Sequence, residues 1–229
     1  MCGRFTIHSK LNLLLQQFAL EMDERELPDF EPRYNLAPTN QAPVILQTES
    51  GRKLELMRWG LIPSWAKDKS IGNRTINARA ESLSDKPSFR SAFKRRRCLV
   101  PADGYYEWMK VGKEKQAFLI RTIDERPFAM AGLWETWHDP DTAKNVPSFT
   151  IVTTAANDAT SQIHDRTPVI LTPSEFDLWL DPEVQETPRL QTLLDALPAD
   201  RIKVDPVGNY VNKVGHEGEQ CVQIQRTLF

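Results

Sequence analysis

The chain has 229 residues, a formal net charge of −2 and 40% hydrophobic residues, with six Trp and ten Phe among them. This length and composition suffice for one compact folded domain, which we expect to span residues 1–229. The slightly acidic charge excludes the chain-wide excess of Lys and Arg that is typical of a non-specific duplex binder. Any nucleic-acid site must therefore be a local patch.

The sequence contains no run of about 18 apolar residues, and its first ten residues lack the charged-then-apolar plan of a signal peptide. We therefore expect a cytoplasmic protein, associated with the nucleoid if it is bacterial, without a membrane partner. The three cysteines, Cys2, Cys98 and Cys221, fit neither a disulfide framework nor a C-x-x-C metal site. We expect them to stay reduced, and we expect Cys98 and Cys221, which lie in apolar strand contexts, to be structural. We predict neither a metal nor a cofactor.

Residues 11–20 carry apolar side chains at helical spacing, whereas short runs rich in β-branched and aromatic residues dominate the middle of the chain. We predict strands at 42–48, 54–61, 98–108, 116–123, 128–137, 148–156, 168–172 and 201–207. Thr followed by Pro predicts helix starts at Thr172 and Thr187, the first with a capping box to Glu175. The fold class is thus α+β, with a mainly antiparallel, barrel-like β core and peripheral helices.

The amino terminus is a candidate reactive group. N-terminal Met is commonly removed before a residue as small as Cys2, and removal would expose a free amine beside a thiol. An α-amine has a reference pKa of about 7.7 to 8.0, so a useful fraction is neutral near pH 7 and can attack an aldehyde. The thiol can then close a five-membered thiazolidine ring on the Schiff base. Alternatively, Cys2 is an incidental small residue in a frayed terminus.

Several short segments combine polar residues that a plain β core would not need. They are residues 1–5 (MCGRF), 34–38 (YNLAP), 59–65 (WGLIPSW), 77–81 (NARAE), 103–108 (DGYYEW) and 163–168 (IHDRTP). Together they closely resemble the SRAP family of abasic-site processing proteins, from residue 2 to near the C-terminus. Residues 208–213 (GNYVNK) are similar to a late segment of that family in slightly rearranged form.

The resemblance implies that Cys2 forms a thiazolidine with the ring-opened sugar of an abasic site in single-stranded DNA, which shields the lesion. It also implies catalytic roles for Asn77, Glu107 and His164. Residue chemistry agrees, because Glu107 lies among aromatic residues that can desolvate its carboxyl and raise its pKa, which suits a proton shuttle. His164 can exchange protons near neutral pH as the sugar ring opens, and Asn77 can hold the amine or a sugar hydroxyl.

Arg4 and Arg79 are candidate phosphate ligands, because a guanidinium matches phosphate oxygens and both lie beside proposed catalytic residues. Arg166 is a further DNA-binding candidate, although a neighbouring Asp165 can pair with it. The basic run 94–97 is either a DNA contact or a solvated helix end.

Apolar side chains can form a wedge against unstacked bases, as aromatic platforms do in proteins that bind single strands. The candidates are Pro38, Leu61 and Trp65. We expect Trp59 and Trp108 to pack in the core.

Three functions remain open at this stage. The first is covalent processing of abasic sites by a monomer, with possible β-elimination (lyase) activity and an unknown replication-fork partner. The second is a thiol peptidase that uses Cys2, His164 and Glu107. The third is a non-catalytic module that binds single-stranded DNA, in which Cys2 has no chemical role.

Overall fold

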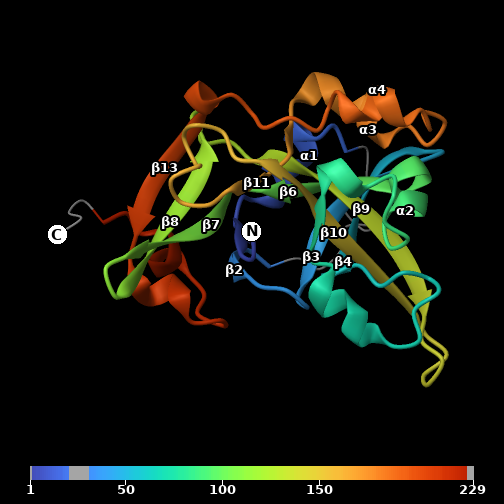
Figure 1. The fold of residues 1–229 in the computed structure, drawn as a ribbon, viewed down its shortest axis with the longest axis horizontal. Coiled ribbons are helices and arrows are strands. Elements are labelled where there is room, and N and C mark those ends of the chain that lie inside the picture. Colours follow the sequence, from blue (N-terminus) through green and yellow to red (C-terminus); the bar gives the residue numbers. More distant parts are fainter. Residues whose placement is uncertain (1, 21–30, 226–229) are drawn as a thin grey trace.

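The computed structural model describes residues 2–20 and 31–225, and it has the expected α+β class (Figure 1). The strands are β1 (Phe5–Ile7), β2 (Arg33–Leu36), β3 (Gln41–Thr48), β4 (Gly51–Trp59), β5 (Asn77–Arg79), β6 (Arg97–Ala102), β7 (Gly104–Val111), β8 (Glu114–Thr122), β9 (Phe128–His138), β10 (Asn145–Ala155), β11 (Arg166–Pro168), β12 (Ile170–Leu171) and β13 (Ile202–Val207). The α-helices are α1 (Leu11–Gln17), α2 (Arg90–Arg95), α3 (Phe176–Leu180) and α4 (Thr187–Gln191).

Five strands close into a barrel in the order β10-β4-β3-β6-β9, because β9 pairs with both β6 and β10. Neighbours in the barrel are antiparallel except β4 and β10, which run parallel. Buried apolar side chains from all five strands belong to one core cluster. The prediction of a mainly antiparallel, barrel-like core is confirmed. Strand β5 extends this sheet by pairing with β10 in parallel.

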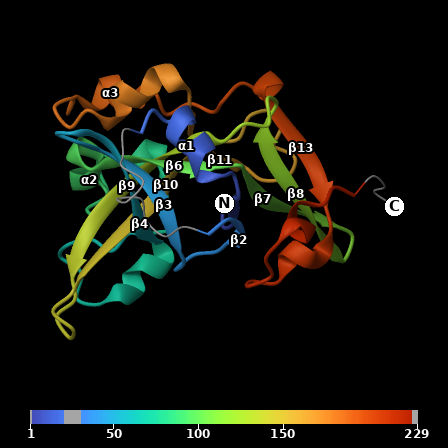
Figure 2. The same ribbon diagram turned by 180° about the vertical axis from the view of Figure 1, so that it is seen from behind.

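A second sheet has the order β13-β8-β7-β1-β2 and lies beside the barrel, as two opposite views show (Figures 1 and 2). The predicted strand at 98–108 is therefore wrong as a single element: β6 belongs to the barrel and β7 to the second sheet. The break falls at Asp103, which is 9% exposed. Its carboxylate accepts hydrogen bonds from the backbone N–H groups of His8 (2.5 Å) and Ser9 (2.8 Å). Asp103 thereby fixes the strand β1 that follows Cys2.

Helices α1, α3 and α4 lie together against one end of the barrel (Figures 1 and 2). The capping box is confirmed, because Thr172 N–H donates to Glu175 Oε2 at 2.6 Å ahead of α3. The start of α4 was misplaced by one residue, since Thr187 is already helical and Glu186 precedes it. Helix α1 ends earlier than predicted, and Ala19 has a left-handed φ of 48°. Among the described residues, no helix is long and apolar enough to cross a membrane.

Candidate functional site

Cys2 lies where the two sheets meet. Strand β1 pairs with β7 on one side and β2 on the other, and Tyr106 N–H donates to Arg4 O at 2.9 Å. This pairing holds the chain start alongside Glu107. Cys2 itself is fully buried, and its carbonyl oxygen accepts a 2.7 Å hydrogen bond from Asn77 Nδ2. The alternative of a frayed terminus is therefore wrong for Cys2, while Met1 lies outside the described residues.

Glu107 is 5% exposed on β7. Burial raises the pKa of its carboxyl, as the sequence predicted, and the nearby His164 opposes that rise. Burial also raises the pKa of the Cys2 thiol, and the charge of Glu107 raises it further. The Cys2 thiol is thus held neutral close to a carboxyl whose pKa is raised by burial. A raised pKa suits that carboxyl to proton exchange.

His164 lies on the turn before β11, and its side chain is 29% exposed. Its Nδ1 atom is 3.0 Å from the backbone N of Arg166 and 2.8 Å from Asp165 Oδ1. The Arg166 N–H contact needs a lone pair on Nδ1, whereas donation to Asp165 needs a hydrogen on that atom. The two contacts therefore call for different hydrogen placements on the imidazole ring.

Glu107 and His164 both line an open pocket of about 490 Å³. It is lined by Arg4, Glu107, Trp108, Lys115, His164 and Asn212. The Arg4 guanidinium lies over the Trp108 ring, 5.2 Å from its centroid. Trp108 is half-buried: it packs against the smaller core cluster, as predicted, and it also lines the pocket. The pocket combines two cations with a carboxyl and an imidazole, a suitable set for an anionic, reactive ligand.

A second pocket, of about 660 Å³, lies on the other side of the His164–Arg166 turn. Asn77, Arg79 and Arg166 line it, together with Arg74, Thr75, Glu81, Ser82, Lys86, Ser88 and Phe89. Arg79 is exposed and makes no ion pair within the described ranges, so its guanidinium is available to a ligand. Arg166 pairs with Glu81 through two contacts of 2.5 and 2.9 Å, not with Asp165.

Of the three residues predicted to form an apolar wedge, two are accessible and one lies in the core. Trp65 is 59% exposed and Pro38 is half-buried, so both can reach a ligand. Leu61 is fully buried in the core and is therefore wrong as a wedge residue. Trp59 is buried as predicted. In the basic run, Arg97 is buried and Arg96 pairs with Glu135, which leaves only residues 94 and 95 exposed.

The remaining cysteines have structural surroundings. Cys98 is buried on β6 as expected, and burial raises the pKa of its thiol. Cys221 is also buried, but it lies in a 3-10 helix (Glu219–Val222) and not in the strand context that we expected. Within the described residues, no cluster of His, Cys, Asp and Glu side chains could hold a metal ion.

Sequence reasoning named Asn77 but missed four residues that lie near the proposed site residues: Asn35, Lys115, Thr153 and Asn212. Asn77 Oδ1 and Thr153 Oγ1 are buried and have no hydrogen-bond partner in the described part of the chain, so both are available to a ligand. They lie on the paired strands β5 and β10. Lys115 and Asn212 line the Arg4 pocket, and Asn35 contacts Arg4 directly. Asn35 lies in the quoted 34–38 segment, whereas nothing in the local sequence distinguishes Lys115 or Thr153.

Comparisons with known proteins agree with this geometry. A family model described as SOS response associated peptidase (SRAP) matches residues 1–214. The chain is 39% identical over 224 residues to the Bacillus subtilis protein named abasic site processing protein YoqW, which covers 97% of this chain and 99% of that one. It is 31% identical over 228 residues to the Escherichia coli protein named abasic site processing protein YedK, with 97% and 99% covered. A crystal structure of a Bacteroides thetaiotaomicron protein superposes with a TM-score of 0.88 at 28% identity, covering 98% of this chain and 100% of the other. The chain belongs to the SRAP family.

Proposed function

We propose that this protein acts on abasic sites in DNA, and that Cys2 links it covalently to the lesion in single-stranded DNA once Met1 has been removed. The observation that carries the proposal is the placement of Cys2, whose carbonyl is held by Asn77, beside Glu107, which lines a pocket together with Arg4 and His164. The names of the bacterial relatives support the same substrate.

The proposed reaction has two steps, Schiff-base formation and ring closure. The neutral α-amine of Cys2 attacks the C1′ aldehyde of the ring-opened deoxyribose, and loss of one water gives a Schiff base. The Cys2 sulfur then adds to the carbon of the C=N bond while the nitrogen takes up a proton, which closes the thiazolidine without a further leaving group. The ring closure gains from being intramolecular. The Schiff base can alternatively lose the 3′ phosphate by β-elimination, which would give a lyase activity.

Three side chains have distinct proposed roles in this reaction. Glu107, whose pKa is raised by burial, gives a proton to the departing water and accepts one from the thiol. His164 donates a proton to the ring oxygen as the closed sugar opens. Asn77 donates its amide N–H to Cys2 O, and its buried Oδ1 is left to accept from the amine or a sugar hydroxyl.

Single-stranded DNA fits the surface on both sides of Cys2. Arg4 and Arg79 provide guanidinium groups for phosphates, one in each pocket. Trp65 is exposed enough to stack on an unpaired base, with Pro38 as a second apolar contact. Arg166 donates to Glu81 and to Thr153 O, so we infer that it braces the turn carrying His164 and contacts DNA less than the other two arginines.

Intact mass spectrometry after incubation with an abasic oligonucleotide tests the proposal. The expected product has the mass of the protein without Met1 plus the oligonucleotide minus one water. An oligonucleotide whose abasic aldehyde has been reduced to an alcohol with borohydride is the matched control and should give no adduct. Attachment to protein that retains Met1, or equal attachment to the reduced oligonucleotide, would contradict the proposal.

Replacing Glu107 by Gln should slow adduct formation about 100-fold, because a general acid–base group is lost.

The Glu107→Gln change should also stabilise the free protein at neutral pH. Since burial raises the pKa of this carboxyl, its contribution to stability is present below the ordinary carboxyl range and is lost as pH rises through the raised pKa. Thermal unfolding should therefore show a Glu107→Gln gain at pH 7 that disappears below about pH 4.

The control for this prediction is Glu135→Gln, because Glu135 is a largely buried carboxylate that pairs with Arg96 away from the site. That variant should keep the wild-type rate and lose some stability at neutral pH. If the Glu107→Gln variant crosslinks at the wild-type rate, Glu107 has no role in proton transfer.

A thiol peptidase is the second candidate, because the family description names a peptidase and Cys2 lies close to Glu107, which in turn lies close to His164. A peptidase cysteine attacks as a thiolate, which requires a lowered pKa. Burial and the charge of Glu107 raise the pKa of the Cys2 thiol, which opposes that role. Hydrolysis of peptide substrates by the wild type, and not by Cys2→Ala, would favour the peptidase.

A further inference from the structure

The segment between β13 and the end of the described chain forms a wall of the Arg4 pocket. It contains two short 3-10 helices, Asn209–Asn212 and Glu219–Val222, and lies beside β8 and β2 (Figure 1, red). Asn212 Oδ1 accepts a 2.7 Å hydrogen bond from Trp108 Nε1 at the pocket. We refer to residues 209–222 as the C-terminal wall.

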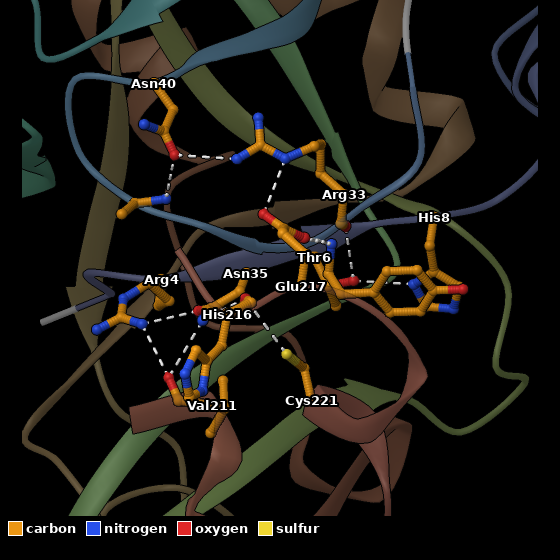
Figure 3. Close-up of polar contacts among 12 residues, drawn as sticks. Arg4, Thr6, His8, Arg33, Asn35, Asn40, Val211, His216, Glu217 and Cys221 are labelled. Carbon is orange, nitrogen blue, oxygen red and sulfur yellow. Dashed lines mark hydrogen bonds and ion pairs between the residues drawn. The ribbon is translucent and has the colours of Figure 1, made fainter. Parts of the chain in front are cut away.

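Asn35 joins this wall to the start of the chain, and it is only 1% exposed (Figure 3). Its Oδ1 atom accepts a 2.7 Å hydrogen bond from Arg4 Nη1. The two N–H groups of its Nδ2 atom are shared among three carbonyl oxygens of the wall, those of Val211 (3.2 Å), Lys213 (3.1 Å) and His216 (3.0 Å). Only an amide combines an acceptor for Arg4 with donors for these carbonyls in so small a side chain.

A second tie holds the same wall against β2. Glu217 accepts from Arg33 Nε at 2.8 Å and from the backbone N–H of Tyr34 at 2.7 Å, as Figure 3 shows for the Arg33 side chain. Arg33 and Tyr34 are therefore bound to the wall as well. The position of the wall relative to β2 is thus fixed at these two residues in addition to Asn35.

These contacts determine how Arg4 lies. Its Nη1 atom donates both to Asn35 Oδ1 and to Val211 O, the latter at 2.9 Å. The guanidinium plane lies over Trp108, which the wall holds through Asn212. No carboxylate within the described residues pairs with Arg4, and its Nε and Nη2 atoms make no hydrogen bond there. One edge of the guanidinium is therefore held, and the other remains for an anion.

We propose that Asn35 is a positioning residue, which sets the Arg4 guanidinium through the C-terminal wall so that its free edge binds a phosphate beside the lesion. The inference rests on the proposed function, because it takes that phosphate to be one of the single-stranded DNA. Asn35 does not touch the DNA itself. It fixes a donor pair in advance, so that the orientation of Arg4 has no ordering cost when the DNA binds.

The salt dependence of DNA binding separates this role from a merely structural one. Each phosphate contact to a single strand contributes about 0.7 to the slope of log K against log salt. Asn35 is uncharged, yet Asn35→Ala should lower that slope by about 0.7, as Arg4→Met should, because the Arg4 contact is lost in both. The half-saturating concentration of abasic oligonucleotide should rise about fivefold at low salt while the maximal crosslinking rate stays near the wild-type value.

A double-variant cycle and a stability control complete the test. In an Arg4→Met background, Asn35→Ala should change neither the slope nor the half-saturating concentration further. Arg97→Lys, a destabilising change on the helix side of the barrel, should leave both quantities at the wild-type value. An Asn35→Ala slope equal to the wild-type slope, or effects of Asn35→Ala and Arg4→Met that add fully, would overturn the inference.

The outcome is distinguishable from a failure of the proposed function. If wild-type protein forms no adduct, the proposed function fails, and the geometric part of the inference is still measured by nitrogen-edited NMR of the free protein. The hydrogen-bonded Arg4 guanidinium should give resolved N–H signals in the wild type that broaden in Asn35→Ala and persist in Arg97→Lys. Signals unchanged by Asn35→Ala would overturn the positioning role without any DNA.

Discussion

Protein with Ala at position 2 should form no adduct with abasic single-stranded DNA that survives heat and detergent. Ala, like Cys, is small enough to allow Met1 removal, so the variant keeps its free amine and loses only the sulfur. It can still form the Schiff base, but without ring closure this bond hydrolyses. Denaturing gels should show no shifted band for the variant, whereas addition of cyanoborohydride should trap one.

The fate of the DNA gives a second readout for the same variant. When the thiol cannot capture the Schiff base, more of it should undergo β-elimination, so Cys2→Ala should cut the abasic strand more than wild type. Cys98→Ala is the matched control, because Cys98 is also a fully buried thiol, and it lies on β6 and lines neither pocket. It should crosslink like wild type. A detergent-stable adduct that persists in Cys2→Ala without reductant would sink the thiazolidine mechanism.

Replacing Arg97 by Lys should cost about 2 to 4 kcal/mol of unfolding free energy, because several buried carbonyl groups lose their donor. Arg97 is 3% exposed, and its guanidinium donates to the carbonyl oxygens of Trp179 (2.5 Å), Phe93 (2.7 Å) and Asp181, together with those of Lys94 (2.6 Å) and Val184 (3.0 Å). The shorter, three-donor ammonium of Lys cannot reach all five. Urea unfolding of both proteins at the same pH measures the difference.

The neighbouring Arg95→Lys is the control, because Arg95 is exposed and should tolerate the change within about 0.5 kcal/mol. The Arg97 variant should keep its crosslinking rate at temperatures where it remains folded, since its contacts join α2 and α3 to β6 and not to the pocket. Equal unfolding midpoints for wild type and Arg97→Lys would show that these five hydrogen bonds contribute little net stability.

Elements set by local chemistry were predictable from the sequence. The capping box at Thr172 and the long β-rich runs that form β3, β8, β9 and β10 depend on neighbouring residues, and the structure confirms them. Strands β1 and β5 are three residues each, too short for a hydrophobic period to be read. The break at Asp103 was missed because its cause, donation from His8 and Ser9, lies more than 90 residues away in sequence.

The same distinction holds for the site. Cys2, Asn77, Glu107 and His164 could be proposed from the sequence because each lies in a short motif, and the structure brings Asn77 and Glu107 to Cys2. Trp108 was assigned to the core because a Trp on a strand usually packs there, and only the approach of Arg4 and Asn212 makes it a pocket wall. The role of Asn35 depends on three carbonyls 176 to 181 residues further along the chain, which no local pattern encodes.

The hydrogen bond between Arg4 and Val211 O spans 207 residues. Arg4 therefore leaves the ribosome well before the carbonyl that holds it is made. The amine of Cys2 can be uncovered while the chain is still being synthesised, but the pocket beside it is incomplete until the C-terminal wall has emerged and folded back. A chain without the wall would thus carry the proposed nucleophile without a finished DNA-binding site, and the proposed reaction with abasic DNA would begin only once the wall is in place.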